Sequence, residues 1–170
     1  MRLWGRFAPR LVFVVKRSRS TRKHLSGLPD PERWSYAQGD HELRCFRWIG
    51  STADGGDGGA ADRLRFLLIH GIGMGHLTFT RFIEALLPYA EIIAVDLPGF
   101  GDSPEPETAL SIADTAELVA EAMRAASVER GIGPLIAVGH SMGAQVVSEL
   151  AAAHPELVDR MFRASRFAAG

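Results

Sequence analysis

The chain has 170 residues, 46% of them hydrophobic, and a net charge of −1. This composition excludes a disordered polypeptide, and the charge excludes a global field that would attract nucleic acid. The sequence has no apolar run long enough for a membrane span. Its one cysteine, Cys45, cannot form an internal disulfide, so we expect a cytoplasmic protein.

The first 32 residues are rich in arginine and lysine and contain no acidic residue before Asp30. A basic arm of this kind could contact an anionic membrane surface weakly, or nucleic acid. The simpler interpretation is a solvated, poorly ordered leader, and we favour it. We therefore expect the folded domain to span residues 33–160, with no specific nucleic-acid partner.

Two short strands are expected at 33–38 and 42–49, with a hairpin turn at Gly39-Asp40 between them. The glycines of the stretch 50–62 have no strand or lysine in the register of a phosphate-binding loop, so we interpret the stretch as a flexible connector.

From residue 64 onward, strand and helix patterns alternate. Apolar runs predict buried strands at 64–69, 92–95 and 135–138. Helical periodicity predicts helices at 77–89, after the capping pair Ser111 and Asp114, and from 141 to about 154. This alternation predicts an α/β fold with three αβα layers: a mostly parallel sheet with an N-terminal antiparallel hairpin. In such sheets function collects at the carboxyl ends of the strands, here at 70–76, 96–104 and 139–143.

The segment Gly139-His140-Ser141-Met142-Gly143 joins the last expected strand to a helix. A sharp strand-to-helix turn crowds the positions two before and two after its centre, and Gly139 and Gly143 meet that demand. Ser141 would then project beside a helix N-terminus, where negative charge is favoured. We predict Ser141 as the nucleophile and the Met142 N–H as one oxyanion donor. The alternative is a serine that only caps the helix.

The segment His70-Gly71-Ile72-Gly73-Met74-Gly75 follows the strand at 64–69. A tetrahedral oxyanion needs a second donor, and the Ile72 N–H is the natural candidate, because flanking glycines allow close approach. A dinucleotide-binding loop is the competing interpretation. It fails because His76 occupies the place of the third glycine.

These two motifs, with Asp96-Leu97-Pro98-Gly99-Phe100-Gly101-Asp102-Ser103-Pro104 as a third between them, resemble the α/β-hydrolase fold in order and spacing over roughly residues 35–160. The resemblance implies Ser141 as nucleophile and Ile72 with Met142 as the oxyanion hole. It implies that His70 orders the oxyanion loop and that Asp96 and Asp102 shape the turn after the second strand. Gly71, Gly139 and Gly143 would be structural. Serine at the elbow argues against the dehalogenase and epoxide hydrolase branches. No cofactor and no metal are implied.

In this family the triad acid and histidine follow the nucleophile on later strands. The chain has only 29 residues after Ser141, so we expect neither the general base nor the acid to be present in it. The segment 161–170 contains two arginines where the fold calls for an apolar strand. We interpret it as an atypical tail from a truncated or frame-altered end, which would leave 135–138 as an exposed edge and the chain marginally stable.

The expected function is a serine hydrolase acting on a carboxylic ester or related acyl bond of a small molecule, nearly inactive as this chain. His76 is a candidate for a substitute base, and the alternative is a surface or helix-start histidine. The alternatives are a non-catalytic ligand-binding remnant of the fold, or an acyltransferase, C–C hydrolase or cofactor-free peroxidase on the same scaffold. The sequence leaves the oligomeric state open.

Overall fold

The computed structural model describes residues 27–50, 64–128 and 135–164. Within them lies a six-stranded sheet with the strand order β1-β2-β4-β3-β5-β6. The strands are β1 (Glu32–Gln38), β2 (His41–Ile49), β3 (Leu64–Ile69), β4 (Ala90–Asp96), β5 (Leu135–His140) and β6 (Arg160–Ala164). β1, β2 and β4 pair antiparallel, and β4, β3, β5 and β6 pair parallel. The mostly parallel sheet with an N-terminal antiparallel hairpin is confirmed.

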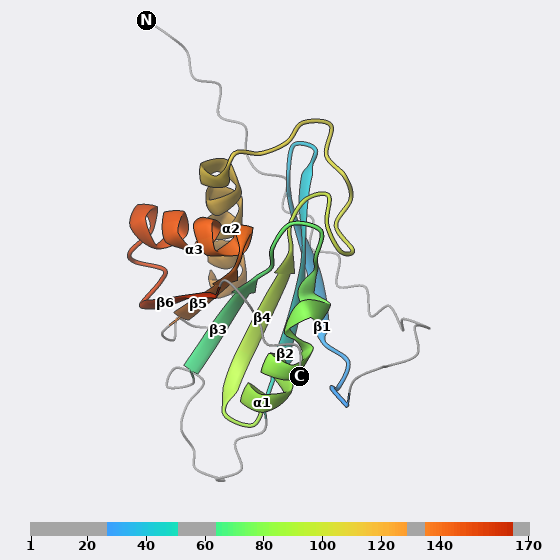
Figure 1. Ribbon diagram of the computed structural model, residues 1–170, viewed down its shortest axis with the longest axis vertical. Coiled ribbons are helices and arrows are strands. Elements are labelled where there is room, and N and C mark those ends of the chain that lie inside the picture. Colours follow the sequence, from blue (N-terminus) through green and yellow to red (C-terminus); the bar gives the residue numbers. More distant parts are fainter. Residues whose placement is uncertain (1–26, 51–63, 129–134, 165–170) are drawn as a thin grey trace, which may run out of the picture.

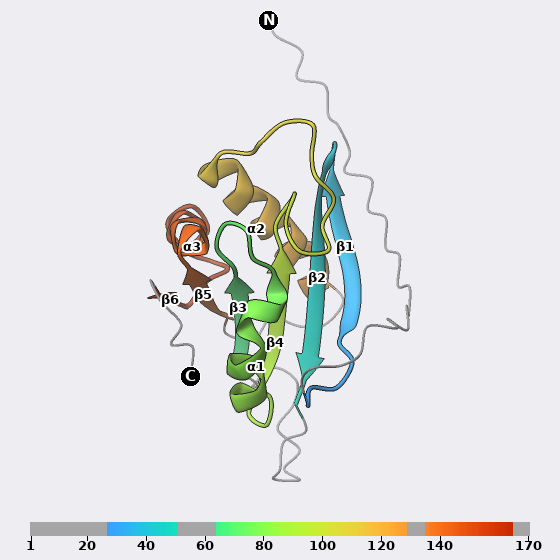
Figure 2. The same ribbon diagram turned by 45° about the vertical axis from the view of Figure 1, so that its right-hand side comes forward.

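The helices cover the two faces of the sheet unequally (Figures 1 and 2). α2 (Ile112–Val128) and α3 (Met142–Ala153) lie on one face, and the short α1 (Thr80–Leu86) lies on the other. A separate hydrophobic cluster fills each face, the larger one under α2 and α3. The expected helix at 77–89 is instead a 3-10 turn, η2 (His76–Phe79), followed by α1. No helix in the described part of the chain is long and apolar enough to cross a bilayer.

Burial on both faces explains why the central strands have continuous apolar sequences. Every residue of β4 and β5 is buried. β4 contains two acidic residues: Glu91, which forms an ion pair with Arg47 at 2.7 Å and lies 3.7 Å from Arg65, and Asp96 at its end, which binds His76. The charged groups are therefore tolerated because they are paired.

The parallel register brings the carboxyl ends of the central strands together. Ile69 at the end of β3 pairs with Val95 of β4 on one side and with Gly139 of β5 on the other. The turns that follow, at 70–76, 96–104 and 139–143, therefore emerge side by side at one edge of the sheet. This register is what assembles the candidate site from three separate segments of sequence.

The C-terminal segment departs from the sequence-based expectation. Residues 160–164 form β6, which pairs parallel with β5, so 161–164 are not an atypical tail and β5 is not the edge of the sheet. The carboxylate of Asp159 accepts the Leu135 N–H at 2.7 Å, and its own N–H donates to the Leu135 carbonyl. These bonds explain how a segment that is not apolar joins the sheet. Residues 165–170 lie outside the described residues.

The leader prediction lies mostly outside the described residues, which begin at Gly27. Of the predicted leader, 27–32 is described, and β1 begins at Glu32. The Pro29 carbonyl accepts the Trp48 indole N–H at 2.9 Å, and Leu28 packs on the core cluster of the α1 face. These last residues before β1 are thus attached to the domain. The predicted connector, beyond Gly50, also lies outside the described residues.

Candidate active site

Ser141 stands at the junction of β5 and α3 with φ +53° and ψ −115°, the only positive φ of a non-glycine residue in the described parts of the chain. Such a conformation costs free energy and persists where the surrounding structure imposes it. The residue is exposed, and its side chain makes no capping hydrogen bond to α3 within the described structure. The hydroxyl is therefore not used as the helix cap that was the alternative interpretation.

The flanking glycines leave no room for a side chain. A Cβ at Gly139 would overlap the Gly143 carbonyl, and a Cβ at Gly143 would overlap the Ile69 carbonyl. Both obstacles are backbone atoms, which cannot rotate away. The G-x-S-x-G spacing thus follows from the approach of α3 to β3 and β5. The Ser141 N–H donates to the Ala164 carbonyl at 3.0 Å, so β6 also helps to hold the turn.

The loop after β3 lies directly against this serine. A Cβ built on Gly71 would be 3.0 Å from the Ser141 Cβ and 3.2 Å from the His140 Nδ1. Glycine at 71 therefore lets the two turns touch. Ile72, the predicted oxyanion donor, follows immediately and is 70% exposed, and the other predicted donor, Met142, is partly buried at the first position of α3. The structure brings all three segments together. The donor role of the two N–H groups stays a prediction.

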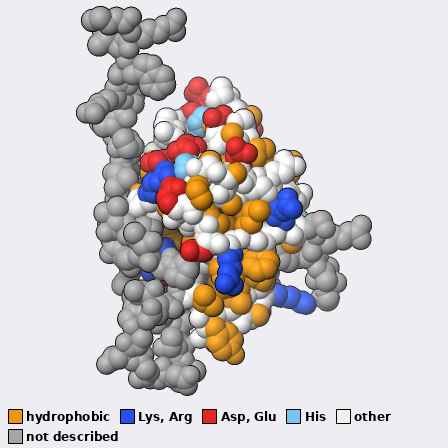
Figure 3. All heavy atoms as spheres, turned by 90° about the vertical axis from the view of Figure 1, so that its left-hand side faces the viewer, with side chains coloured by type: hydrophobic (Ala, Val, Ile, Leu, Met, Phe, Trp, Pro, Cys, Tyr) orange, Lys and Arg blue, Asp and Glu red, His pale blue; other side chains and the backbone are white. Residues whose placement is uncertain are grey.

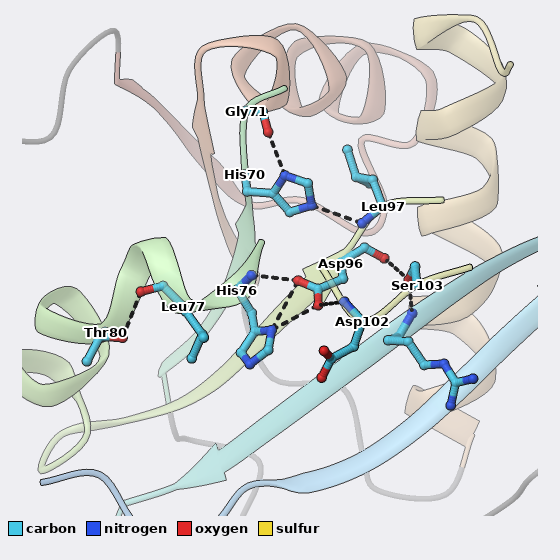
Figure 4. Close-up of polar contacts among 10 residues, drawn as sticks. His70, Gly71, His76, Leu77, Thr80, Asp96, Leu97, Asp102 and Ser103 are labelled. Carbon is cyan, nitrogen blue, oxygen red and sulfur yellow. Dashed lines mark hydrogen bonds and ion pairs between the residues drawn. The ribbon is translucent and has the colours of Figure 1, made fainter. Parts of the chain in front are cut away.

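His70 connects the loop after β3 to the turn after β4 (Figure 4). Its Nδ1 donates to the Gly71 carbonyl at 2.7 Å, and its Nε2 accepts the Leu97 N–H at 3.0 Å. These partners require the neutral Nδ1–H tautomer. Burial, which disfavours the imidazolium, lowers the pKa of His70, although the Gly71 carbonyl and Asp96 oppose it. His70 is thus placed where the predicted ordering role needs it, and it is neutral near pH 7.

Asp96 is a second buried connection between the same two turns. Its carboxylate accepts hydrogen bonds from the His76 Nδ1–H at 2.9 Å and from the Asp102 N–H at 2.8 Å. Burial raises the pKa of Asp96, but the hydrogen bonds from His76 and Asp102 outweigh burial and leave the pKa below its ordinary value. The carboxylate is therefore ionised and holds the 96–104 turn. Asp102 contributes through its backbone, because its side chain is exposed.

His76 is neither a surface residue nor placed as a substitute base, but it does start a helical turn, because η2 begins at His76. Its ring is buried, stacks on Phe46 of β2 with 3.6 Å between ring centroids, and binds Asp96. In Figure 4 the ring extends away from Gly71 and towards β2. This role had no local sequence signal, since it depends on β2 lying beside β4.

Two other described histidines are bound elsewhere. His41 bonds to the Thr108 carbonyl, and His154 bonds to Glu117 and Arg124 between α2 and α3. His24 lies outside the described residues. No group of three or more potential metal ligands occurs among residues 27–50, 64–128 and 135–164.

Comparison with known proteins supports the arrangement. A family model described as the alpha/beta hydrolase fold matches residues 65–165. The pimeloyl-[acyl-carrier protein] methyl ester esterase of Yersinia enterocolitica is 35% identical over 92 residues, covering 54% of this chain and 32% of that protein. The (E)-2-((N-methylformamido)methylene)succinate hydrolase of Acinetobacter baylyi is 30% identical over 95 residues, covering 56% and 35%.

Among solved structures, a bacterial membrane phospholipase A described as a virulence factor superposes with a TM-score of 0.61 at 30% identity, covering 83% of this chain and 42% of that chain. The present chain thus spans about a third of the length of the curated relatives it matches. The family match nevertheless covers more than half of this chain, including all three turns that form the site. The chain belongs to the α/β-hydrolase fold family.

Proposed function

We propose that this chain carries the nucleophile and the oxyanion-binding elements of a serine hydrolase that cleaves carboxylic esters or related acyl bonds. The observation that carries the proposal is Ser141 itself: an exposed serine in a strained left-handed conformation, uncapped, against Gly71. Strained residues of this kind gather at functional sites. The similar protein from Yersinia is named a methyl ester esterase, and the similar solved structure is named a phospholipase A.

The proposed chemistry is acyl transfer through the serine. The Ser141 Oγ attacks the substrate carbonyl carbon and loses its proton to a general base. The carbonyl oxygen becomes an oxyanion that accepts hydrogen bonds from the Ile72 and Met142 N–H groups, at the positive end of α3. The alcohol leaves with the proton, and water then releases the acid from the acyl-serine.

The general base is not assigned to any described histidine. His41, His70, His76 and His154 all have hydrogen-bond partners other than Ser141. His140, which precedes Ser141, is buried with its Nδ1 against Gly71. A serine hydroxyl needs a base within hydrogen-bond reach, and loss of that histidine costs about six orders of magnitude in turnover. We therefore infer that this chain alone hydrolyses esters very slowly. The same observation favours the second candidate function, a ligand-binding protein without turnover.

Covalent labelling tests the nucleophile. The chain is incubated with a small fluorophosphonate probe, and the modified residue is identified by peptide mass spectrometry. Because no base is assigned to Ser141, we expect slow phosphonylation of Ser141, no labelling in Ser141→Ala, and the same slow rate in Ser148→Ala as in the native chain. Ser148 is the matched control because it lies in α3, where its hydroxyl donates to the Ala144 carbonyl at 2.8 Å. Labelling that persists in Ser141→Ala would refute the nucleophile.

Ester turnover separates the two candidate functions. Hydrolysis of p-nitrophenyl acetate that is above the background rate and lost in Ser141→Ala supports the hydrolase. Tight ligand binding by a chain that neither hydrolyses the ester nor is labelled at Ser141 supports the binding protein. Adding a competing alcohol acceptor distinguishes acyl transfer from hydrolysis by its ester product.

A further inference from the structure

β6 is the last strand in the order of the sheet, so one of its two edges has no neighbouring strand among the described residues. Its other edge pairs parallel with β5, from Ile136 opposite Arg160 to His140 opposite Ala164. An unpaired edge presents a row of backbone N–H and C=O groups that can take up a further strand. Figure 3 shows this side of the molecule, where basic side chains lie among hydrophobic ones.

The hydrogen bonds to β5 determine which backbone groups of β6 face outward. The Ala164 carbonyl accepts the Ser141 N–H at 3.0 Å, so Ala164 directs its backbone groups towards β5. Because successive residues of a strand direct these groups to alternate sides, Phe162 also faces β5, whereas Met161 and Arg163 face away from it. The outer edge therefore offers the N–H and C=O groups of Met161 and Arg163 to a partner strand.

Each face of this edge carries one basic and one large apolar side chain. Paired residues of neighbouring strands point to the same face of a sheet, and Val138, the partner of Phe162, belongs to the core cluster of the α1 face. Arg160 and Phe162 therefore lie on the α1 face, and Met161 and Arg163 lie on the face of α2 and α3. Met161 is 43% exposed and Phe162 58%, and both arginines are exposed as well.

The charge of the edge indicates what kind of strand fits it. No acidic residue occurs within β6, and neither arginine forms an ion pair with another described residue. The preceding acid, Asp159, accepts the Leu135 N–H at 2.7 Å. Two copies of this edge would bring four arginines together, and like charges on adjacent strands are destabilising. The edge therefore favours an acidic strand over a second copy of the chain.

We propose that the outer edge of β6 binds an extended acidic peptide segment by β-strand addition. The peptide backbone pairs with the outward groups of Met161 and Arg163, and its side chains supply the specificity. The fit requires one carboxylate opposite Arg160 and another opposite Arg163. Apolar side chains belong opposite Met161 and Phe162. The partner pattern is therefore acid-apolar-apolar-acid, which is the same in both chain directions.

Peptide titration tests this pattern. The acetylated amide of Thr-Glu-Val-Ile-Glu-Thr is titrated into the isotope-labelled full chain, and amide chemical shifts report binding. We expect a dissociation constant of about 1 mM or below, with the largest shifts at the Met161 and Arg163 N–H groups. The control peptide Thr-Lys-Val-Ile-Lys-Thr should bind at least about tenfold more weakly. Equal affinities, or no binding of the acidic peptide, overturn the proposal.

Exchanging the charges should reverse the preference. In the double variant Arg160→Glu, Arg163→Glu we expect the lysine peptide to bind at least about fivefold more tightly than the glutamate peptide. Arg81→Glu is the control, because Arg81 is an exposed arginine on α1, away from β6. It should keep the native preference. A preference that changes equally in both variants overturns the assignment to β6.

Two substitutions at Met161 test the backbone pairing. Met161→Ala and Met161→Pro both remove the side chain, but only proline removes the outward N–H, which β5 does not use. We expect the proline variant to bind the acidic peptide at least about threefold more weakly than the alanine variant. Equal affinities overturn strand addition. If circular dichroism shows the proline variant unfolded, hydrogen exchange at the Met161 N–H of the native chain carries the test, and exchange that the peptide does not slow overturns the proposal.

Two other occupants of the edge would be recognised by separate measurements. A dimer in sedimentation velocity that Met161→Ala retains and Met161→Pro loses would place a second copy on the edge and overturn the acidic partner. Binding to phosphatidylserine vesicles without binding of the peptide, and lost in the double glutamate variant, would overturn it in favour of a lipid surface. A monomer that binds the peptide and not the vesicles supports the proposal.

Discussion

β5 and β6 are neighbouring parallel strands with opposite environments. All six residues of β5 are buried, whereas four of the five in β6 are exposed, among them Met161 and Phe162. Seen from the β6 side, hydrophobic side chains gather on this face with basic side chains among them (Figure 3). The apolar sequence of β5 reflects burial on both faces of the sheet. β6 shows that a segment can form a strand through backbone pairing even where its side chains are exposed.

The largest expected effect comes from adding one methyl group at the buried end of this comparison, where β5 turns into α3. In Gly143→Ala the new Cβ overlaps the Ile69 carbonyl, which is backbone and cannot move aside. We expect the free energy of unfolding, from urea titration, to fall by at least about 3 kcal/mol.

Gly39→Ala is the control for that methyl group. Gly39 has φ +65° and open space around it, so only the left-handed conformation is penalised. A loss of about 1 kcal/mol is expected. Equal losses at the two glycines would show that the elbow is not sterically special.

The second prediction compares a central side chain with an edge side chain. Leu67 of β3 is fully buried, and Met161 of β6 is 43% exposed. Leu67→Ala should lower the free energy of unfolding by about 3 kcal/mol, because a cavity remains. Met161→Ala should lower it by less than about 1 kcal/mol. A larger loss at Met161 in the same urea titrations would mean that β6 is a buried strand.

The third prediction concerns the two aspartates of the 96–104 turn. Asp96→Asn weakens a buried acceptor of the His76 and Asp102 N–H groups, and we expect a loss of about 2 kcal/mol in the free energy of unfolding. Asp102→Asn changes only an exposed side chain and should stay within about 0.5 kcal/mol. If the two variants lose the same amount, the carboxylate of Asp96 does not hold the turn.

The smallest expected effect is the pH dependence caused by His70. Its pKa is lowered in the folded chain, mainly by burial, from the ordinary value of 6.5. The unfolded chain therefore takes up a proton first as the pH falls through 6.5, and the free energy of unfolding decreases there. Urea titrations at pH 7.5 and 5.5 should show a smaller decrease for His70→Asn than for the native chain. Identical decreases would exclude His70 as the cause.

Asp96 acts with the same sign at lower pH. Its folded-state pKa is below 3.8, so its contribution to stability is present above about pH 4 and is lost as the pH falls through the folded pKa. Acid titration of Asp96→Asn should lack this part of the loss. The two pH ranges are separate because the ordinary pKa of a histidine is 6.5 and that of an aspartate is 3.8.

The local sequence predicted the central strands and the turn at Ser141, because hydrophobic patterning and steric space within a few residues determine both. Apolar runs located β3, β4 and β5, and the glycines around Ser141 predicted a turn that their contacts require. The helix expected at 77–89 was partly wrong, since the chain forms a 3-10 turn where the His76 ring binds Asp96. Nothing within a few residues of His76 encodes that partner.

What the sequence by itself determined is the alternation of strand and helix, the sharp turn at Ser141 and the small residues around it, because each depends on periodicity or on space within a few residues. Only the tertiary structure decided that β6 joins the sheet, that His76 is a buried partner of Asp96, and that Gly71 lies against Ser141. These features depend on strand order and register, which place residues far apart in the chain within contact, and no local pattern records them.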